Sequence, residues 1–234
     1  MPFGWRKKDE PVKLDTGELD AFDRALPGDA GSIGPAVGWT EKDTRVLLGR
    51  DLPMFTAFVA GHARSSVAGG AMRFLLPSTN PSLVSWNSRG GWHADWPSVE
   101  PSVAFATDWM GRLFLLLPRS NGKGGGPALG LLETSTGELT VFDYAFAEIL
   151  AALAGDWRGL LAADRLDEWR AAGNAAPTFD QVVAPKQPLF LGGSEEISEM
   201  ELTPLVVAVS FGGQMWEQVK DLPPGTKISG VSIR

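Results

Sequence analysis

Apolar residues change their spacing along the chain, and the change predicts two kinds of element. Near the start, Leu19, Phe22 and Leu26 are three and four positions apart, which places them on one face of a helix. From about residue 51 the pattern changes to short runs between turns that contain glycine and proline. These runs predict strands over residues 55–59, 71–76, 82–86, 103–107, 113–117, 128–133 and 139–142.

Glycine-rich stretches separate these elements. Residues 28–38 are interpreted as a loop, residues 121–126 as the flexible tip of a hairpin, and residues 135–138 as the turn between two strands. None of them has the glycine spacing, or the following Ser/Thr and helix, that a phosphate-binding loop requires. We therefore predict no nucleotide cofactor.

Helical spacing returns in the second half of the chain. Helices are predicted over residues 144–154 and 156–172, with Asp156 as the N-cap of the second. A last helix is predicted from Pro204, with Thr203 as its N-cap, to about Asp221; a strand over 205–211 is the alternative. Alternating residues then predict a final strand over 227–233.

This order of elements, with strands first, helices afterwards and a strand returning at the end, indicates an α+β fold in which helices pack on an antiparallel sheet. We divide the chain into an N-terminal helix and flexible segment (residues 1–45), a β-rich part (46–118) and a C-terminal α+β part (119–234). The last two parts could also form one continuous domain.

Composition narrows the function. The chain of 234 residues is 44% hydrophobic, carries a net charge of -7 and contains no cysteine. The acidic balance argues against nucleic-acid binding, and the absence of cysteine excludes disulfides and thiolate chemistry. No export signal and no apolar stretch long enough to cross a membrane are recognised, so we expect a cytoplasmic protein.

Acidic residues concentrate between Glu133 and Glu201, where 13 acidic residues face 4 basic ones. The densest run contains Glu195, Glu196, Glu199 and Glu201. Such a run is either a solvated surface or a face that attracts a basic partner. We take these four glutamates as candidate partner-binding residues.

Trp86, Trp92, Trp96 and Trp109 lie close together in the chain. They indicate either a core beneath a sheet or, for Trp92 and Trp96, an exposed anchor patch for a partner protein. Stacking on a carbohydrate is a weaker third interpretation. The core and the anchor patch are the two leading interpretations, and the choice between them is open at this point.

The sequence offers only one candidate group of catalytic residues, centred on His93. His93 and Asp95 could touch on an extended segment and pair with Ser65 or Ser66 in a hydrolase, but no nucleophile elbow accompanies them. The second histidine, His62, is not at metal-ligand spacing from the first, and no carboxylate spacing supports a cation site. We predict no metal, no cofactor and no enzymatic activity.

Four blocks occur in an order that resembles a known family. They are VAFATDWMGRLF (103–114), LLETSTGE (131–138), PLFLGG (188–193) and GQMWEQVKDLPPGT (213–226). Together they are similar to the immunity proteins of type VI secretion DNase effectors, with a GAD-like front part over 46–118 and a C-terminal immunity domain, and are related in style to the SUKH immunity class. The resemblance implies a cytoplasmic, non-catalytic bacterial protein that binds a cognate toxin.

The sequence therefore predicts a protein that neutralises a toxin, expected to be a basic nuclease. A scaffold or regulatory module that binds a different protein is the alternative, and a hydrolase that uses His93 is a weaker one.

Overall fold

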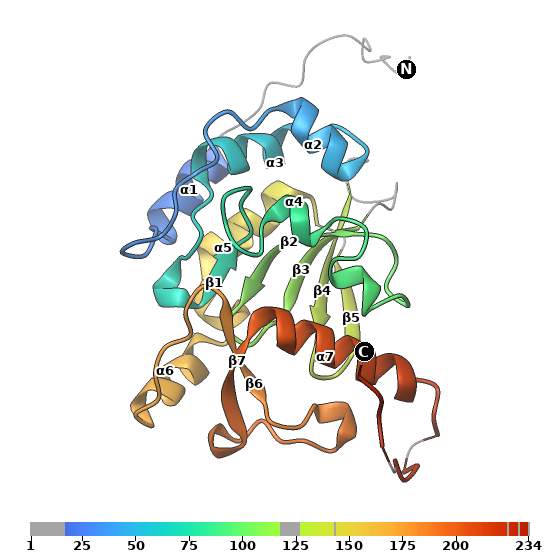
Figure 1. The fold of residues 1–234 in the computed structure, drawn as a ribbon. Helices are drawn as coiled ribbons and strands as arrows, with labels where there is room; N and C mark the ends of the chain where they lie inside the picture. Colours follow the sequence, from blue (N-terminus) through green and yellow to red (C-terminus); the bar gives the residue numbers. More distant parts are fainter. Residues whose placement is uncertain (1–16, 118–126, 143, 224, 229, 234) are drawn as a thin grey trace, which may run out of the picture.

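The computed structural model describes residues 17–117, 127–142, 144–223, 225–228 and 230–233, and its centre is a five-stranded antiparallel sheet (Figure 1). Strands follow one another in chain order across this sheet, from β1 at one edge to β5 at the other. The strands are β1 (Met72–Phe74), β2 (Val103–Asp108), β3 (Leu113–Leu117), β4 (Ala128–Glu133) and β5 (Glu138–Phe142). The predicted α+β fold with an antiparallel sheet is confirmed.

The inner strands are buried on both faces, which explains their continuous apolar sequence. Every residue of β2 and β3 is buried, whereas β5 is mostly exposed. Antiparallel strands with one solvated face alternate in polarity, and strands covered on both sides do not need to. The five predicted strands in these regions, 71–76, 103–107, 113–117, 128–133 and 139–142, are confirmed within a few residues.

Helices α1 (Gly17–Ala25), α3 (Pro53–Ala57) and α5 (Phe146–Leu160) cover one side of the sheet through edge-to-face phenylalanine contacts. Phe58 lies 5.4 Å from Phe22 and 5.5 Å from Phe146, measured between ring centroids. Phe146 in turn lies 5.5 Å from Phe105 of β2. The helix predicted from Leu19, Phe22 and Leu26 is α1, and all three side chains are buried.

Two of the predicted strands are wrong because local helix-start signals, a proline in one case and a serine cap in the other, favour helices there. Residues 55–59 belong to α3 and to the π-helical turn Phe58–His62 that continues it, and Pro53 occupies the first helical position. Residues 83–86 form α4 (Leu83–Trp86), where Ser82 and Ser85 cap each other. The same reciprocal capping, between Thr40 and Asp43, begins α2 (Glu41–Leu48), a helix that the apolar pattern did not indicate.

The predicted helix boundary at Asp156 is a kink and not an end. Helix α5 continues through Asp156, whose φ of -149° is non-helical, to Leu160, and α6 follows (Ala163–Ala171). The carboxylate of Asp156 accepts a hydrogen bond from the backbone N–H of Gly159 at 3.0 Å. Asp156 thus caps the last turn of α5 as predicted for an N-cap, but the second helix begins later.

A second, two-stranded sheet was not predicted. It consists of β6 (Gln181–Pro185) and β7 (Met200–Pro204), which we call the β6–β7 hairpin together with the residues 186–199 that connect them. The N–H of Val183 donates to the carbonyl of Trp109 at 2.8 Å, so β6 is attached to the turn after β2. Thr203 therefore lies in a strand and does not cap the next helix.

Helix α7 (Leu205–Val219) follows β7 directly and lies beside the β6–β7 hairpin (Figure 1). The predicted helix is confirmed and the alternative strand over 205–211 is wrong. No strand is formed by the described residues among 227–233, so the predicted final strand is wrong. Residues 121–126, the predicted hairpin tip, lie outside the described residues.

Candidate functional site

The two sides of α7 differ in their surroundings. Leu205, Val209 and Met215 are buried against the rest of the molecule. Val207 and Phe211, four residues apart and therefore on one face, are 51% and 39% exposed. Spacing of three and four residues groups Phe211 with Ala208 and Met215 in the sequence, whereas the structure leaves Phe211 at the surface.

Two glycines determine which side of α7 is buried. A Cβ atom on Gly212 would lie 2.9 Å from the carbonyl oxygen of Thr134, and one on Gly213 would lie 2.6 Å from the indole nitrogen of Trp96. Glycine weakens a helix interior by about 1 kcal/mol, but here it allows the helix backbone to approach Thr134 and Trp96 closely. Because the glycine side faces inward, Phe211 is left at the surface.

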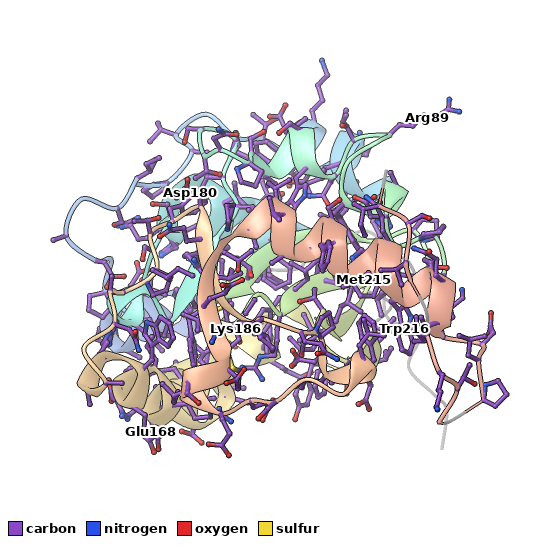
Figure 2. The ribbon with its side chains drawn as sticks, turned by 60° about the horizontal axis from the view of Figure 1, so that its bottom comes forward. Arg89, Glu168, Asp180, Lys186, Met215 and Trp216 are labelled. Carbon is purple, nitrogen blue, oxygen red and sulfur yellow. The ribbon has the colours of Figure 1, made fainter. Side chains whose placement is uncertain are left out.

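A groove runs between this exposed side of α7, the β6–β7 hairpin and the turn between β4 and β5. Figure 2 shows the hairpin, marked by Lys186, beside the helix that carries Met215 and Trp216. The groove has a volume of about 280 Å³. Its lining is largely apolar and consists of Met110, Thr134, Ser135, Ala184, Pro185, Lys186, Pro188, Glu201, Thr203, Val207, Ala208, Phe211 and Gly212.

The wall formed by the hairpin is held by hydrogen bonds. The ammonium group of Lys186 donates to the carbonyl of Ser198 at 2.6 Å, and its backbone N–H donates to the carbonyl of Glu199 at 2.9 Å. The N–H of Phe190 donates to the carbonyl of Ser135 at 3.3 Å, which connects the hairpin to the turn after β4. The charge of Lys186 is therefore directed at the hairpin's own backbone.

The four predicted glutamates all lie on this hairpin, and all four are exposed. Glu195 pairs with Arg165 of α6 at 3.0 Å. Within the part of the chain that the structure describes, Glu196, Glu199 and Glu201 form no ion pair. Glu201 also lines the groove. The structure thus places an acidic hairpin with three uncompensated carboxylates beside an apolar groove.

A buried charge cluster lies beneath the turn between β4 and β5. Arg112 donates a short hydrogen bond to the fully buried Asp108 and lies 4.0 Å from Glu133. Burial, followed by the charge of Asp108, raises the pKa of Glu133 from 4.5 to about 7. The hydroxyl of Ser135, a groove residue, donates to the Glu133 carboxylate at 3.0 Å.

The tryptophans belong to the core. Trp92 and Trp96 are 2% and 0% exposed, so neither presents its ring to a partner, and the core interpretation is the one that the structure supports. The indole N–H of Trp96 donates to the carbonyl of Val209 in α7 at 2.8 Å, and that of Trp92 donates to Asn87 at 3.1 Å. Trp96 thus supports the groove from behind without lining it.

The structure does not bring the hydrolase candidates together. His93 Nε2 contacts the backbone of Ser102, 2.7 Å from its carbonyl oxygen, and burial lowers the pKa of this imidazole. Asp95 accepts from Gln214, and His62 pairs with Asp23 at 2.8 Å. The serines serve the backbone and a neighbouring carboxylate: Ser65 accepts from the N–H of Ile33 at 2.7 Å, and Ser66 donates to Asp29 at 2.6 Å.

The described residues contain no group of three or more His, Cys, Asp or Glu residues arranged to hold a metal ion. Over the same ranges, no helix has the length and apolar character needed to pass through a membrane.

Sequence reasoning missed the groove because its walls come from a hairpin that was not predicted. The weak signals were the β-branched pair Val182-Val183 for β6 and the pair Val206-Val207, which lies in the segment where a strand was the alternative. Exposure of an apolar helical residue becomes visible only when the packing of the helix is known.

Comparison with known proteins gives a fold and no function. No family model matches the chain, and no curated protein matches it. Among solved structures, the crystal structure of Atu4351 from Agrobacterium tumefaciens is similar, with a TM-score of 0.58 and 13% sequence identity. The similarity covers 84% of this chain and 88% of Atu4351. At this identity the likeness shows that the two chains share an overall fold.

Proposed function

We propose that this chain binds and neutralises a cognate bacterial toxin, a basic and nuclease-like protein, without catalysing a reaction. The observation that carries the proposal is the apolar groove between α7 and the β6–β7 hairpin, together with the exposed glutamates of that hairpin, of which Glu201 lines the groove. The resemblance of the four sequence blocks to type VI immunity proteins supports the toxin as the partner.

The apolar part of the groove supplies the affinity. Val207 and Phe211 expose about half and two-fifths of their surface to solvent on one helical face. Burial of apolar surface contributes about 25 cal/mol per Å², and aromatic side chains near the centre of an interface often dominate its energy. A partner that inserts an apolar side chain between Phe211 and the hairpin would gain this energy.

The glutamates of the hairpin make binding selective for a basic partner and raise the rate of association. The hairpin region, residues 181–204, contains four glutamates and one lysine, and three of the glutamates have no ion pair within the described residues. Uncompensated charge of one sign accelerates encounter with a partner of opposite charge. A nuclease must hold phosphate and therefore presents a basic surface, which these glutamates complement.

The direct test is co-expression with the product of the gene adjacent to the one that encodes this chain, followed by size exclusion and a nuclease assay. We expect a co-eluting complex in which DNA cleavage is suppressed. A complex without suppression would favour the scaffold or regulatory function, and the absence of a complex would overturn the proposal.

Matched variants locate the interface. Glu196→Lys, Glu199→Lys and Glu201→Lys, combined in one chain, should weaken the complex by at least tenfold, since three favourable charge contacts become repulsive. The control chain carries Asp20→Lys, Glu41→Lys and Glu168→Lys, which change net charge equally at exposed positions elsewhere. Equal weakening by both chains would show that only overall charge matters.

The apolar wall is tested in the same assay. Val207→Ser combined with Phe211→Ser should weaken the complex by at least tenfold. The dependence of the affinity on salt concentration should change little, because no charge is altered. Val46→Ser is the control, because Val46 is 80% exposed on α2. Unchanged affinity of the double variant would place the binding face elsewhere.

A further inference from the structure

Strand β5 ends the five-stranded sheet on one side, and within the part of the chain that the structure describes its outer edge is unpaired. It pairs with β4 along one edge, from Glu133 opposite Glu138 to Leu129 opposite Phe142. Within the described residues, no backbone–backbone hydrogen bond joins Glu138–Phe142 to a segment other than β4, and the N–H of Glu138 donates to the hydroxyl of Thr136 at 3.2 Å. In an antiparallel strand, alternate residues direct their N–H and C=O groups away from the neighbour, so the rest of β5 offers these groups to another strand.

The side chains along this edge are also accessible. Glu138, Thr140 and Val141 are exposed, and the exposed fraction of Val141 is 39%. Just beyond the strand, Tyr144 is 44% exposed and stacks on Phe142 with 5.9 Å between ring centroids. Natural edge strands are commonly shielded by lysine, proline or a bulge, and β5 contains none of these features.

We propose that β5 is a self-association surface, at which a second copy of this chain adds its own β5 in antiparallel register about a two-fold axis at Thr140. This surface lies outside the groove and does not depend on the proposed toxin binding.

The register follows from the length and the charge of the strand. An antiparallel pair of identical five-residue strands matches all five residues of both only when the central residue, Thr140, faces its own copy. In that register Glu138 lies opposite Phe142 and Leu139 lies opposite Val141. The single charge of the strand thus never faces itself, although the chain has a net charge of -7.

A second copy suits this edge because a two-fold interface must be complementary to itself. Apolar residues pair with apolar residues on one face of the joined sheet, and threonine pairs with threonine at the axis, an arrangement that allows a hydroxyl hydrogen bond. The symmetry also brings two Phe142–Tyr144 stacks to the interface, which adds aromatic area at both of its ends.

Single-cysteine variants test the register directly, because the natural chain has no cysteine. Residues directly opposite each other in an antiparallel pair have Cβ atoms about 4.5–5.5 Å apart, close enough for a disulfide after a small adjustment, whereas diagonal neighbours are about 7–8 Å apart. Under mild oxidation Thr140→Cys should form a covalent dimer at least tenfold faster than Val141→Cys. Val46→Cys, on α2, measures random collision.

Charge at the axis gives a second readout by sedimentation of the full chain. Thr140→Lys and Thr140→Glu should each weaken self-association by about tenfold or more, because two like charges then face each other. Mixing the two variants should restore association as a heterodimer. Circular dichroism of each variant shows that the exposed substitution leaves the fold intact.

Three results would overturn the proposal. They are a natural chain that sediments as a monomer at all accessible concentrations, crosslinking of Thr140→Cys no faster than that of Val46→Cys, and failure of the lysine–glutamate mixture to associate. A chain that stays monomeric but pairs β5 with a strand of a different protein would also overturn the proposal, because the partner would not be a second copy.

Discussion

Apolar side chains on the two sides of α7 occupy opposite environments. On the inner side, Val209 accepts a hydrogen bond at its carbonyl from Trp96, which is completely buried. On the outer side, two residues further along, Phe211 is 39% exposed above a groove. A single helix can thus both close the core and form one wall of a surface groove, because glycines allow its inner side to lie close to Thr134 and Trp96.

The largest expected effect comes from the inner side. Trp96→Ala should lower the free energy of unfolding by about 3–5 kcal/mol, because it leaves a cavity behind α7 and removes the indole hydrogen bond to the carbonyl of Val209. Chemical denaturation measures the change. A loss below about 1 kcal/mol would show that the inner side of α7 contributes little to the core, and would remove the contrast with Phe211.

Glu133, the last residue of β4, should make the free energy of unfolding depend on pH. Because its pKa is raised to about 7 in the folded chain, the folded state binds more protons than the unfolded state between pH 4.5 and 7, and stability falls as pH rises through this window. Glu133→Gln should remove this loss and stabilise the chain at pH 8 by about 2 kcal/mol, after allowance for partial exposure. At pH 4.5 the two proteins should be equally stable. Thermal melting curves of both proteins at pH 4.5 and pH 8 measure the difference. An equal difference in stability between the two proteins at both pH values would contradict the raised pKa.

Gly137 lies in the turn between β4 and β5, and its substitution tests how this turn packs against α7. Its φ of +74° favours glycine, and a Cβ atom there would lie 2.2 Å from the ring of Trp216. Gly137→Ala should therefore destabilise the chain by about 1–3 kcal/mol and move Trp216, which tryptophan fluorescence reports. Gly31→Ala is the control, because its φ is also positive at +78° but nothing lies within 4 Å. Equal losses would assign the effect to backbone strain alone.

The smallest effect on stability should come from the outer side. Phe211→Ser is expected to change the free energy of unfolding by about 1 kcal/mol or less, because much of the ring is already in water. The same variant, combined with Val207→Ser, should abolish most partner binding. A loss as large as that of Trp96→Ala would mean that the outer side belongs to the core, and the comparison between the two sides would fail.

The central sheet could be predicted from the sequence because β2 and β3 are continuous apolar runs between clear turns. Helices α1, α5 and α7 were also predictable from their apolar spacing. The segments 55–59 and 82–86 have similar apolar content, but Pro53 and the Ser82–Ser85 cap make them helical. Here the fixed φ of a first-position proline and a serine cap outweigh β propensity, and composition alone does not show this.

The site was predictable only in part. Charge density along the chain identified Glu195, Glu196, Glu199 and Glu201, and the structure places all four on one exposed hairpin. It also shows that Arg165 neutralises Glu195, a contact 30 residues apart in sequence. The groove itself depends on how β6, β7 and α7 pack together, and Trp92 and Trp96, proposed as one of two alternatives for a partner surface, proved to be core residues.

The two sides of α7 differ in whether their residues tolerate substitution. Gly212 and Gly213 have no room for even one added carbon, whereas Val207, Phe211 and the hairpin glutamates can be exchanged with little cost to folding. A chain built in this way can acquire a new binding preference through a handful of surface substitutions while its scaffold is left untouched. Descendants of one such ancestor could therefore diverge quickly in what they recognise and still be superimposable.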